Sequence, residues 1–426
     1  MAFPFESLDK AFLAGTQAPW ASFAPVWRLE YRGTLTQPQL VRALGFVLAR
    51  YPWAAARVQN EAWVLPEAID AQAQFSAIDA DAEKETALAD RFLELSTEAP
   101  LHLTWVRRGD DAGVLVFQQH HSLADGRAFL ALVDDFVKCL DAESSPLPLG
   151  IVPRRREREA LSSRGPLVFL RGALHTVKEL LLGNLRPLAP VFSNVGTDYS
   201  GGNRTLHHFV PRQRLEAWRE PRTKKGLSMN DLLAAALCTA LSRVSKSGGI
   251  HNLFLPIDVR PREGFESFAN HLSSMQLRWR PMPTVLALAQ ALRDAAAPIL
   301  AARLPWKRTL FDAWLVRLSP MALLRKTLLV KRQLLTNFSF SNLVPLGIPG
   351  ADADGKWHTN SLVIDRLLIT TPCTPPQAVN TTVVGYGGDV CFNFNFKDSA
   401  VARADVEALV REFSVALDEV DRTLGC

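Results

Sequence analysis

Two adjacent histidines, followed shortly by an aspartate and a glycine, form the stretch of this chain best suited to chemistry. The run is HHSLADG at residues 120–126, so its pattern is H-H-x-x-x-D-G. An imidazole titrates near neutral pH and can accept and return a proton during a reaction. If both histidines lie in an extended strand, they point to opposite faces and do not bind one metal side by side. One histidine is therefore a candidate general base, and Asp125 either caps a following helix or holds a charged partner.

Hydrophobic periodicity predicts the elements on both sides of this run. Residues 114–117 (VLVF) are short, apolar and preceded by polar residues and Gly113, which indicates a buried strand. After Gly126, apolar residues recur at i, i+3 and i+4 to near Asp141, which indicates a helix. The motif thus lies where a core strand ends and a helix begins. Gly126 suits a point where the backbone turns with positive φ or approaches another segment closely.

The heptad resembles the signature of the CoA-dependent acyltransferase superfamily, which includes chloramphenicol acetyltransferases and the condensation domains of non-ribosomal peptide synthetases. Within it, the chain is most similar to the wax ester synthase/diacylglycerol acyltransferase and polyketide-associated acyltransferase groups. Further segments match in family order: residues 5–13 (FESLDKAFL), 228–237 (SMNDLLAAAL), 256–262 (PIDVRPR) and 340–345 (FSNLVP). The last departs from the family pattern by one extra residue before the proline. With the tail, the resemblance covers nearly the whole chain.

Length and element pattern agree with a two-part architecture. A chain of 426 residues is comfortable for two domains, and its mixture of helices, strands and hairpins favours a mixed α/β (α+β) fold. The resemblance implies two chloramphenicol-acetyltransferase-like α/β sandwich halves that form a V-shaped pseudo-dimer, with the histidine motif at a central cleft. We predict an N-terminal half over residues 1–150, a basic linker or crossover over 151–200, and a C-terminal half over 201–426.

The resemblance also implies a reaction. An acyl group moves from an acyl thioester to an alcohol or amine, His121 acts as general base, and no covalent enzyme intermediate forms. His120 is expected to support the loop rather than react. Asp125 is expected to pair with Arg260 and keep the loop in shape. Gly126 is expected not to tolerate a side chain.

Two further groups of residues are candidates for the site. An oxyanion or acceptor pocket is expected from the segment that resembles the family's S-N element, at Ser339, Ser341 and Asn342. Structural support is expected from Arg260, Asn230, Asp231 and Asn270. Ser228 and Asp231 fit a capping box at the start of a helix, and we prefer that role for Asp231 to catalysis.

The cysteine content and the length of the apolar runs limit the possible compartment and cofactors of this protein. The five cysteines are scattered, odd in number and without a C-x-x-C pair, which predicts a reduced, cytoplasmic protein without a metal site. No apolar run reaches the roughly 18–20 residues of a membrane span, and the first residues lack a signal-peptide pattern. No bound cofactor is expected. By resemblance, acyl-CoA or the phosphopantetheine of a carrier protein is the co-substrate.

Positive charge gathers in two apolar segments. Residues 151–190 carry a net charge of +5 and residues 303–332 a net charge of +7, against +5 for the whole chain. Such segments fit the inner face of a membrane, the phosphates of CoA or an acidic acyl carrier protein. A solvated arginine-rich helix face is the alternative. Nucleic acid is disfavoured because no binding motif accompanies the charge.

Several other classes of function are set aside or kept open. No G-x-S-x-G elbow is present, and the P-loop-like residues 350–356 are followed by Trp357 where Ser or Thr would hold magnesium. Lipid or secondary-metabolite biosynthesis is the setting that the resemblance implies. Two alternatives to the acyltransferase stay open: a condensation-like, amide-forming enzyme that uses carrier-protein thioesters, and a non-catalytic member of the fold that binds acyl thioesters or lipids.

Overall fold

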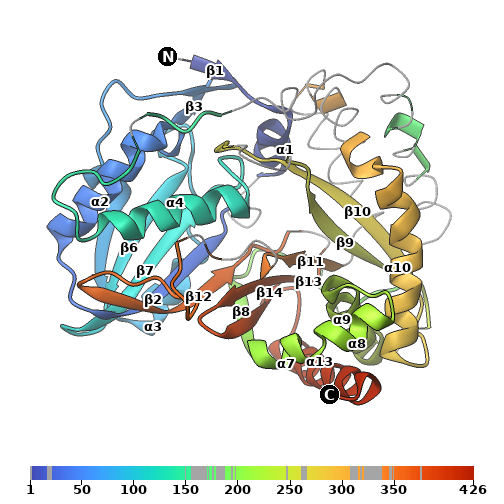
Figure 1. Cartoon of the computed structure of the whole chain (residues 1–426). Helices are drawn as coiled ribbons and strands as arrows, with labels where there is room; N and C mark the ends of the chain where they lie inside the picture. Colours follow the sequence, from blue (N-terminus) through green and yellow to red (C-terminus); the bar gives the residue numbers. More distant parts are fainter. Residues whose placement is uncertain are drawn as a thin grey trace.

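The computed structural model has two halves, each built on one β-sheet with helices packed against it (Figure 1). This confirms the predicted mixed α/β class and two-part architecture. The structure describes residues 2–16, 22–148, 150–154, 170, 172–174, 177–178, 188–192, 195–196, 198–245, 248–260, 266–307, 315–316, 319–320, 338–344, 348, 350–374 and 377–426. Most of the two basic segments predicted as a membrane or carrier contact, and most of the predicted linker 151–200, lie outside these residues.

The sheet of the N-terminal half has the strand order β12-β2-β7-β6-β5. Its strands are β12 (Leu362–Thr370), β2 (Val26–Gly33), β7 (Ala112–Gln119), β6 (Leu101–Arg107) and β5 (Phe75–Asp79). Helices α2 (Gln37–Arg50) and α4 (Gly126–Cys139) bury their apolar sides in the core of this half. The predicted hairpin is present, because β6 and β7 pair antiparallel.

Strand β12 is the place where sequence order and sheet membership differ. It lies within the range predicted as the C-terminal half, yet it pairs antiparallel with β2 along its length. Ile364 is fully buried in the core of the N-terminal half. The chain therefore returns from the second half to complete the first sheet, so residues 201–426 do not form a self-contained half.

The sheet of the C-terminal half has the strand order β10-β9-β11-β13-β14-β8. Its strands are β10 (Leu272–Trp279), β9 (His251–Asp258), β11 (Phe338–Asn342), β13 (Val379–Tyr386), β14 (Asp389–Lys397) and β8 (Asn203–Pro211). Helices α9 (Met229–Ser245), α10 (Val285–Ala301) and α13 (Arg403–Leu424) pack on its apolar face.

The sequence of strand β14 alternates apolar and polar residues, which is typical of a strand with one apolar face. Phe392 and Phe394 enter the helix-covered core, as their alternation predicts. Asn393 and Asn395 on the other face are fully buried as well. Their amides donate to the backbone carbonyls of Thr382 (2.9 Å) and Asn380 (3.0 Å), so burial leaves them satisfied.

Smaller elements complete the molecule. A three-stranded sheet joins β1 (Ala2–Pro4), β4 (Ala62–Val64) and β3 (Arg57–Gln59). Helix α1 (Ser7–Gly15) lies between the two halves in Figure 1. Short helices within the described residues include Pro52–Ala55, Gln72–Gln74, α3 (Ala82–Ala87), α7 (Arg212–Ala217) and α8 (Arg219–Lys224).

Candidate active site

His120 and His121 lie just beyond the end of β7, in a turn rather than in the strand itself. The N–H of Leu123 closes this turn by donating to the carbonyl of His120 at 2.9 Å. The N–H of His120 donates to the carbonyl of Pro100 (2.8 Å), and that of His121 donates to the carbonyl of Phe23 (2.6 Å). Both histidines therefore lie outside the strand, so the alternation of strand side chains does not decide where their rings point. We call residues 120–126 the His loop.

His120 is buried and held as a neutral ring. The N–H of Ser122 donates to its Nδ1 at 3.2 Å, and the hydroxyl of Ser122 lies 2.7 Å from the same atom. Nδ1 is therefore an acceptor, and Nε2 carries the proton toward Thr16 Oγ1 at 3.1 Å. Burial, and next the neighbouring His121, lower the pKa of His120 to about 3. Both nitrogens of His120 are thus engaged within the protein, and its low pKa disfavours protonation of the ring.

His121 is only partly buried, and one residue of the C-terminal half orients it. The Asn270 amide nitrogen donates to the carbonyl of His121 at 2.7 Å, which turns the Asn270 oxygen toward His121 Nδ1 at 3.2 Å. Nδ1 must then carry the ring proton, which leaves Nε2 as the basic atom. Within the described part of the chain, no hydrogen bond engages Nε2. Burial lowers the pKa of His121, while the charge of Asp125 and the bond to Asn270 oppose that effect.

Asp125 combines both roles that the sequence left open. Its Oδ1 accepts from the N–H of Ala128 (3.1 Å) as the N-cap of α4, and its Oδ2 accepts from the N–H of His271 (2.8 Å). Both carboxylate oxygens also lie 2.8 Å from guanidinium nitrogens of Arg260. Burial alone would raise the pKa of Asp125, but Arg260 and the backbone N–H groups lower it further than burial raises it. Asp125 is thus an ionised organiser that faces the protein.

A second ion pair joins the same two halves at the surface. Arg127, one residue after the His loop, lies 3.1 Å from Asp258 at the end of β9. Asp258 also contacts Arg260, through a backbone bond of 2.9 Å and a side-chain distance of 3.4 Å. The end of β9 and the segment that follows it therefore hold the His loop from the C-terminal side. Residues 261–262 of the predicted proline-arginine element lie outside the described residues.

The structure places all three predicted oxyanion residues on β11. Phe340 points into the core, so Ser339 and Ser341 point to the opposite face. Ser339 is 5% exposed, and its hydroxyl has no hydrogen-bond partner among the described residues. Asn342 Nδ2 donates to Asn230 Oδ1 at the start of α9, and its Oδ1 accepts from the N–H of Val344 at 2.9 Å. Ser339 is therefore the candidate with a free donor, whereas Asn342 is already engaged.

Asp231 occupies the predicted capping box. Its N–H donates to Ser228 Oγ (3.2 Å), and its carboxylate accepts from the N–H of Ser228 (2.7 Å). Arg293 of α10 lies 3.2 Å from the same carboxylate. These contacts engage Asp231 in fixing the start of α9.

The φ of Gly126 is not positive, so its backbone conformation does not require glycine. Its close approach to the C-terminal half is what limits a side chain at this position. A Cβ added there would lie 3.2 Å from Leu343 Cδ2 and 3.6 Å from Trp27. The nearest atoms belong to a flexible side chain, which can shift by a few tenths of an ångström. Leu343 directly follows β11, so this contact also brings the end of β11 against the start of α4.

Sequence reasoning missed one part of the site. Helix α1 contacts both histidines, through Phe12 and Thr16, and Arg154 donates to backbone carbonyls of the His loop. The sequence pointed to residues 5–13 only as a resemblance and to Arg154 only as part of a basic run. The one available signal was Asp9, a carboxylate among apolar residues of a short amphipathic helix.

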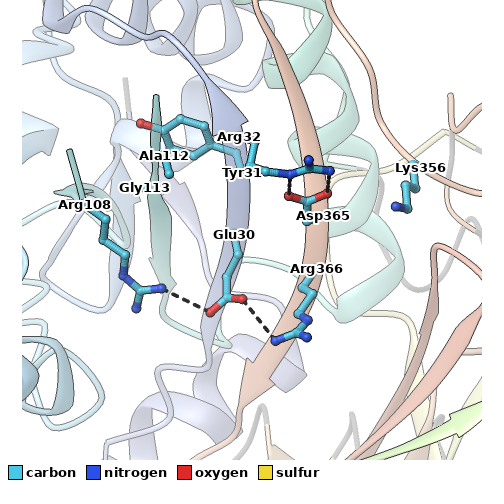
Figure 2. Close-up of a pocket in the computed structure, with 9 residues that line it drawn as sticks. All are labelled: Glu30, Tyr31, Arg32, Arg108, Ala112, Gly113, Lys356, Asp365 and Arg366. Atoms are coloured by element: carbon cyan, nitrogen blue, oxygen red, sulfur yellow. Dashed lines mark hydrogen bonds and ion pairs between the residues drawn. The ribbon is translucent and has the colours of Figure 1, made fainter. Parts of the chain in front are cut away.

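A separate pocket of about 440 Å³ lies on the sheet of the N-terminal half (Figure 2). Arg32 and Asp365 pair across it, and Glu30 lies between Arg108 (3.6 Å) and Arg366 (3.8 Å). The pocket is at the start of β7, whereas the His loop follows its end, about 20 Å away at roughly 3.4 Å per residue. Its three arginines pair with its two carboxylates and it lies away from the His loop, so we place no part of the active site there.

Neither a metal-ligand cluster nor a membrane-spanning helix occurs among the described residues. No cluster of three or more histidine, cysteine or acidic side chains there could hold a metal ion. None of the described helices is both long and apolar enough to cross a membrane.

The fold is shared with an acetyltransferase, a polyketide synthase associated protein and a domain of a non-ribosomal peptide synthetase, as the resemblance implied. Trichothecene 15-O-acetyltransferase TRI3 from Fusarium sporotrichioides matches with a TM-score of 0.77 at 12% identity, over 98% of this chain and 95% of that chain. Polyketide synthase associated protein 5 from Mycobacterium tuberculosis matches with a TM-score of 0.69 at 16% identity, over 99% and 100%. The EpoB NRPS cyclization-docking bidomain from Sorangium cellulosum matches with a TM-score of 0.72 at 15% identity, over 98% and 83%. No family model and no curated protein sequence matches the chain.

Proposed function

We propose that this protein is an acyltransferase that moves an acyl group from a thioester to an alcohol or amine, with His121 as general base. The observation that carries the proposal is the orientation of His121: Asn270 engages Nδ1 and leaves Nε2 as the basic atom. The fold shared with an acetyltransferase and a polyketide-associated protein supports the same class of reaction.

In this mechanism His121 Nε2 accepts the proton of the acceptor's hydroxyl or amine as that group attacks the thioester carbonyl. The proton then passes to the leaving thiolate, so no covalent enzyme intermediate is needed. A positioned base of this kind is typically worth about 10²–10⁴ in rate. A lowered pKa keeps the ring neutral, and therefore able to accept a proton, at physiological pH.

The oxyanion that forms in the transition state needs a hydrogen-bond donor. Ser339 fits this need best among the predicted residues, because its buried hydroxyl has no other partner within the described residues. Asn342 would instead maintain the junction between β11 and α9. Asp125 and Arg260 take no part in proton transfer in this scheme, since both are buried and face one another.

The donor is an acyl thioester, presented on CoA or on the phosphopantetheine of a carrier protein. The carrier-protein donor would make the enzyme condensation-like, and the shared fold of the EpoB cyclization-docking bidomain supports testing it. Both donors present the same thioester group to His121, so one assay with two donor arms separates them.

The test is release of free thiol from acyl-CoAs of graded length and from acylated carrier proteins, with and without a panel of alcohols and amines. His121→Ala should lose about 100-fold or more of acceptor-dependent release. His358→Ala is the matched control, because His358 is exposed and its ion-pair partner in the described structure is Asp352. Release that does not depend on an acceptor, or that survives His121→Ala, would contradict the proposal.

A further inference from the structure

Helix α1 touches both rings of the motif. Phe12 stacks flat on His121, with 4.2 Å between ring centroids and 15° between ring planes. Thr16, directly after α1, lies 3.1 Å from His120 Nε2 and donates its own hydroxyl to the carbonyl of Phe12 at 3.0 Å. Gly15 allows this docking, since a Cβ there would lie 2.6 Å from the ring of Phe23.

A buried ion pair connects α1 to the backbone of the His loop. Asp9 and Arg154 form it, with side chains 1% and 6% exposed. Asp9 also accepts from the indole N–H of Trp63 at 3.0 Å. Arg154 donates to the carbonyl of Leu123 at 2.6 Å and to that of Ser122 at 3.2 Å. One charged pair therefore connects the helix that carries Phe12 to the backbone of the turn that carries His121.

We propose that α1 and Arg154 form a positioning brace, in which Phe12 sets the plane of the His121 ring and Asp9 with Arg154 sets its distance from the acceptor. The inference rests on the proposed function for its kinetic consequences, but its structural part can be tested without turnover. Phe12 and Asp9 are positioning residues, because they act through His121 and not on a substrate atom. Errors of about 1 Å in such positioning can cost about 100-fold in rate.

The stacked ring also removes water from one face of the imidazole. Burial is the largest cause that lowers the pKa of His121, so losing the ring should move this pKa back toward its ordinary value. The charges around His121 are those of Asp125 with Arg260 on one side and of Arg154 with Asp9 on the other. His120, with its pKa lowered to about 3, is neutral near neutral pH, so it adds no charge beside His121 there.

The experiment compares Phe12→Leu with Phe5→Leu in the full chain. Both changes remove a phenyl ring from the same N-terminal segment, but Phe5 packs on Trp63 and not on a histidine. Proteins with ¹³C-labelled histidine are titrated by NMR, and His121→Ala assigns the His121 signal. In the parent protein that signal should be displaced by the ring current of Phe12. Phe12→Leu should abolish the displacement and raise the His121 pKa, whereas Phe12→Tyr should retain both properties and Phe5→Leu should change neither.

Kinetics supply the second readout. Phe12→Leu should lower kcat about 10-fold with an unchanged KM for the acyl donor, and its activity should begin at higher pH. Equal His121 signals in Phe12→Leu and Phe5→Leu would overturn the brace even if the enzyme is active. A displaced signal together with no thioester turnover in the parent protein would instead overturn the proposed function and leave the positioning intact.

Discussion

The His loop is held from two sides, and the two sides use different chemistry. On the C-terminal side, Arg260 pairs with the side chain of Asp125, and Asn270 binds both the ring and the backbone carbonyl of His121. On the N-terminal side, Arg154 binds backbone carbonyls of the loop and Phe12 covers the ring. The first set of contacts uses polar side chains that the motif itself encodes. The second uses the backbone and one ring face, which a sequence motif does not record.

The two buried ion pairs also differ in what remains if one partner is lost. Arg260 has a second carboxylate, Asp258, at 3.4 Å. Across the described ranges, Arg154 pairs with no carboxylate other than Asp9, and its further acceptors are neutral carbonyls. An unpaired buried charge is among the costliest defects in a protein. The N-terminal pair should therefore be the more sensitive one, although the motif draws attention to the other.

The largest expected effect tests that difference directly. Asp9→Asn should lower the free energy of unfolding by about 3–5 kcal/mol, because it leaves Arg154 buried without a counterion. Asp125→Asn should cost less, about 2 kcal/mol, because Asp258 remains near Arg260 and asparagine can still accept one N–H bond. Urea unfolding of both variants measures the two losses. A larger loss for Asp125→Asn would reverse the comparison.

Acid should destabilise both sides of the loop. Burial, and then His121, lower the pKa of His120 to about 3, and burial with Arg260 lowers that of His271 to about 4. The unfolded chain binds these protons below about pH 6.5, while the folded chain does so only near those lower values. Stability is thus complete above pH 6.5 and falls as the pH drops, by about 2 kcal/mol per histidine at pH 5.

Unfolding free energies at pH 7 and pH 5 measure this dependence. His120→Gln should remove the part of the pH-dependent loss of stability that His120 causes and leave the part that His271 causes. An identical pH dependence in this variant would show that His120 can take up a proton without cost, against its assigned place as a neutral ring.

The smallest expected effect concerns the contact between α4 and the segment after β11. Gly126→Ala should change stability by less than about 1 kcal/mol, because the gain in helix propensity offsets the small shift required of Leu343. Gly126→Val should cost clearly more, since a branched side chain meets both Leu343 and Trp27. Thermal unfolding of the two variants distinguishes a tolerant contact from a rigid one. A large loss of stability in Gly126→Ala would mean that Leu343 cannot shift and that its contact with the start of α4 is rigid.

Local patterns predicted most elements near the site. The hairpin of β6 and β7, the Asp125 cap of α4 and the capping box at Asp231 all depend on residues close together in the chain. The Asp125–Arg260 pair was expected only through the resemblance, and the structure brings those side chains together. Strand β12 could not be placed in the N-terminal sheet from its own sequence, because a buried strand carries the same apolar signal in either half.

The sequence by itself determined the motif and the mixed α/β class, since both are encoded in residue types at short spacing, and its resemblance implied the two halves and His121 as the candidate base. Only the tertiary structure decided which nitrogen of His121 is basic, because Asn270 lies 149 positions away. The same holds for Arg154 and Asp9, which are 145 positions apart and meet because α1 docks between the halves. Contacts at such separations follow from how whole elements pack, and the residues involved carry no local pattern that announces the partner.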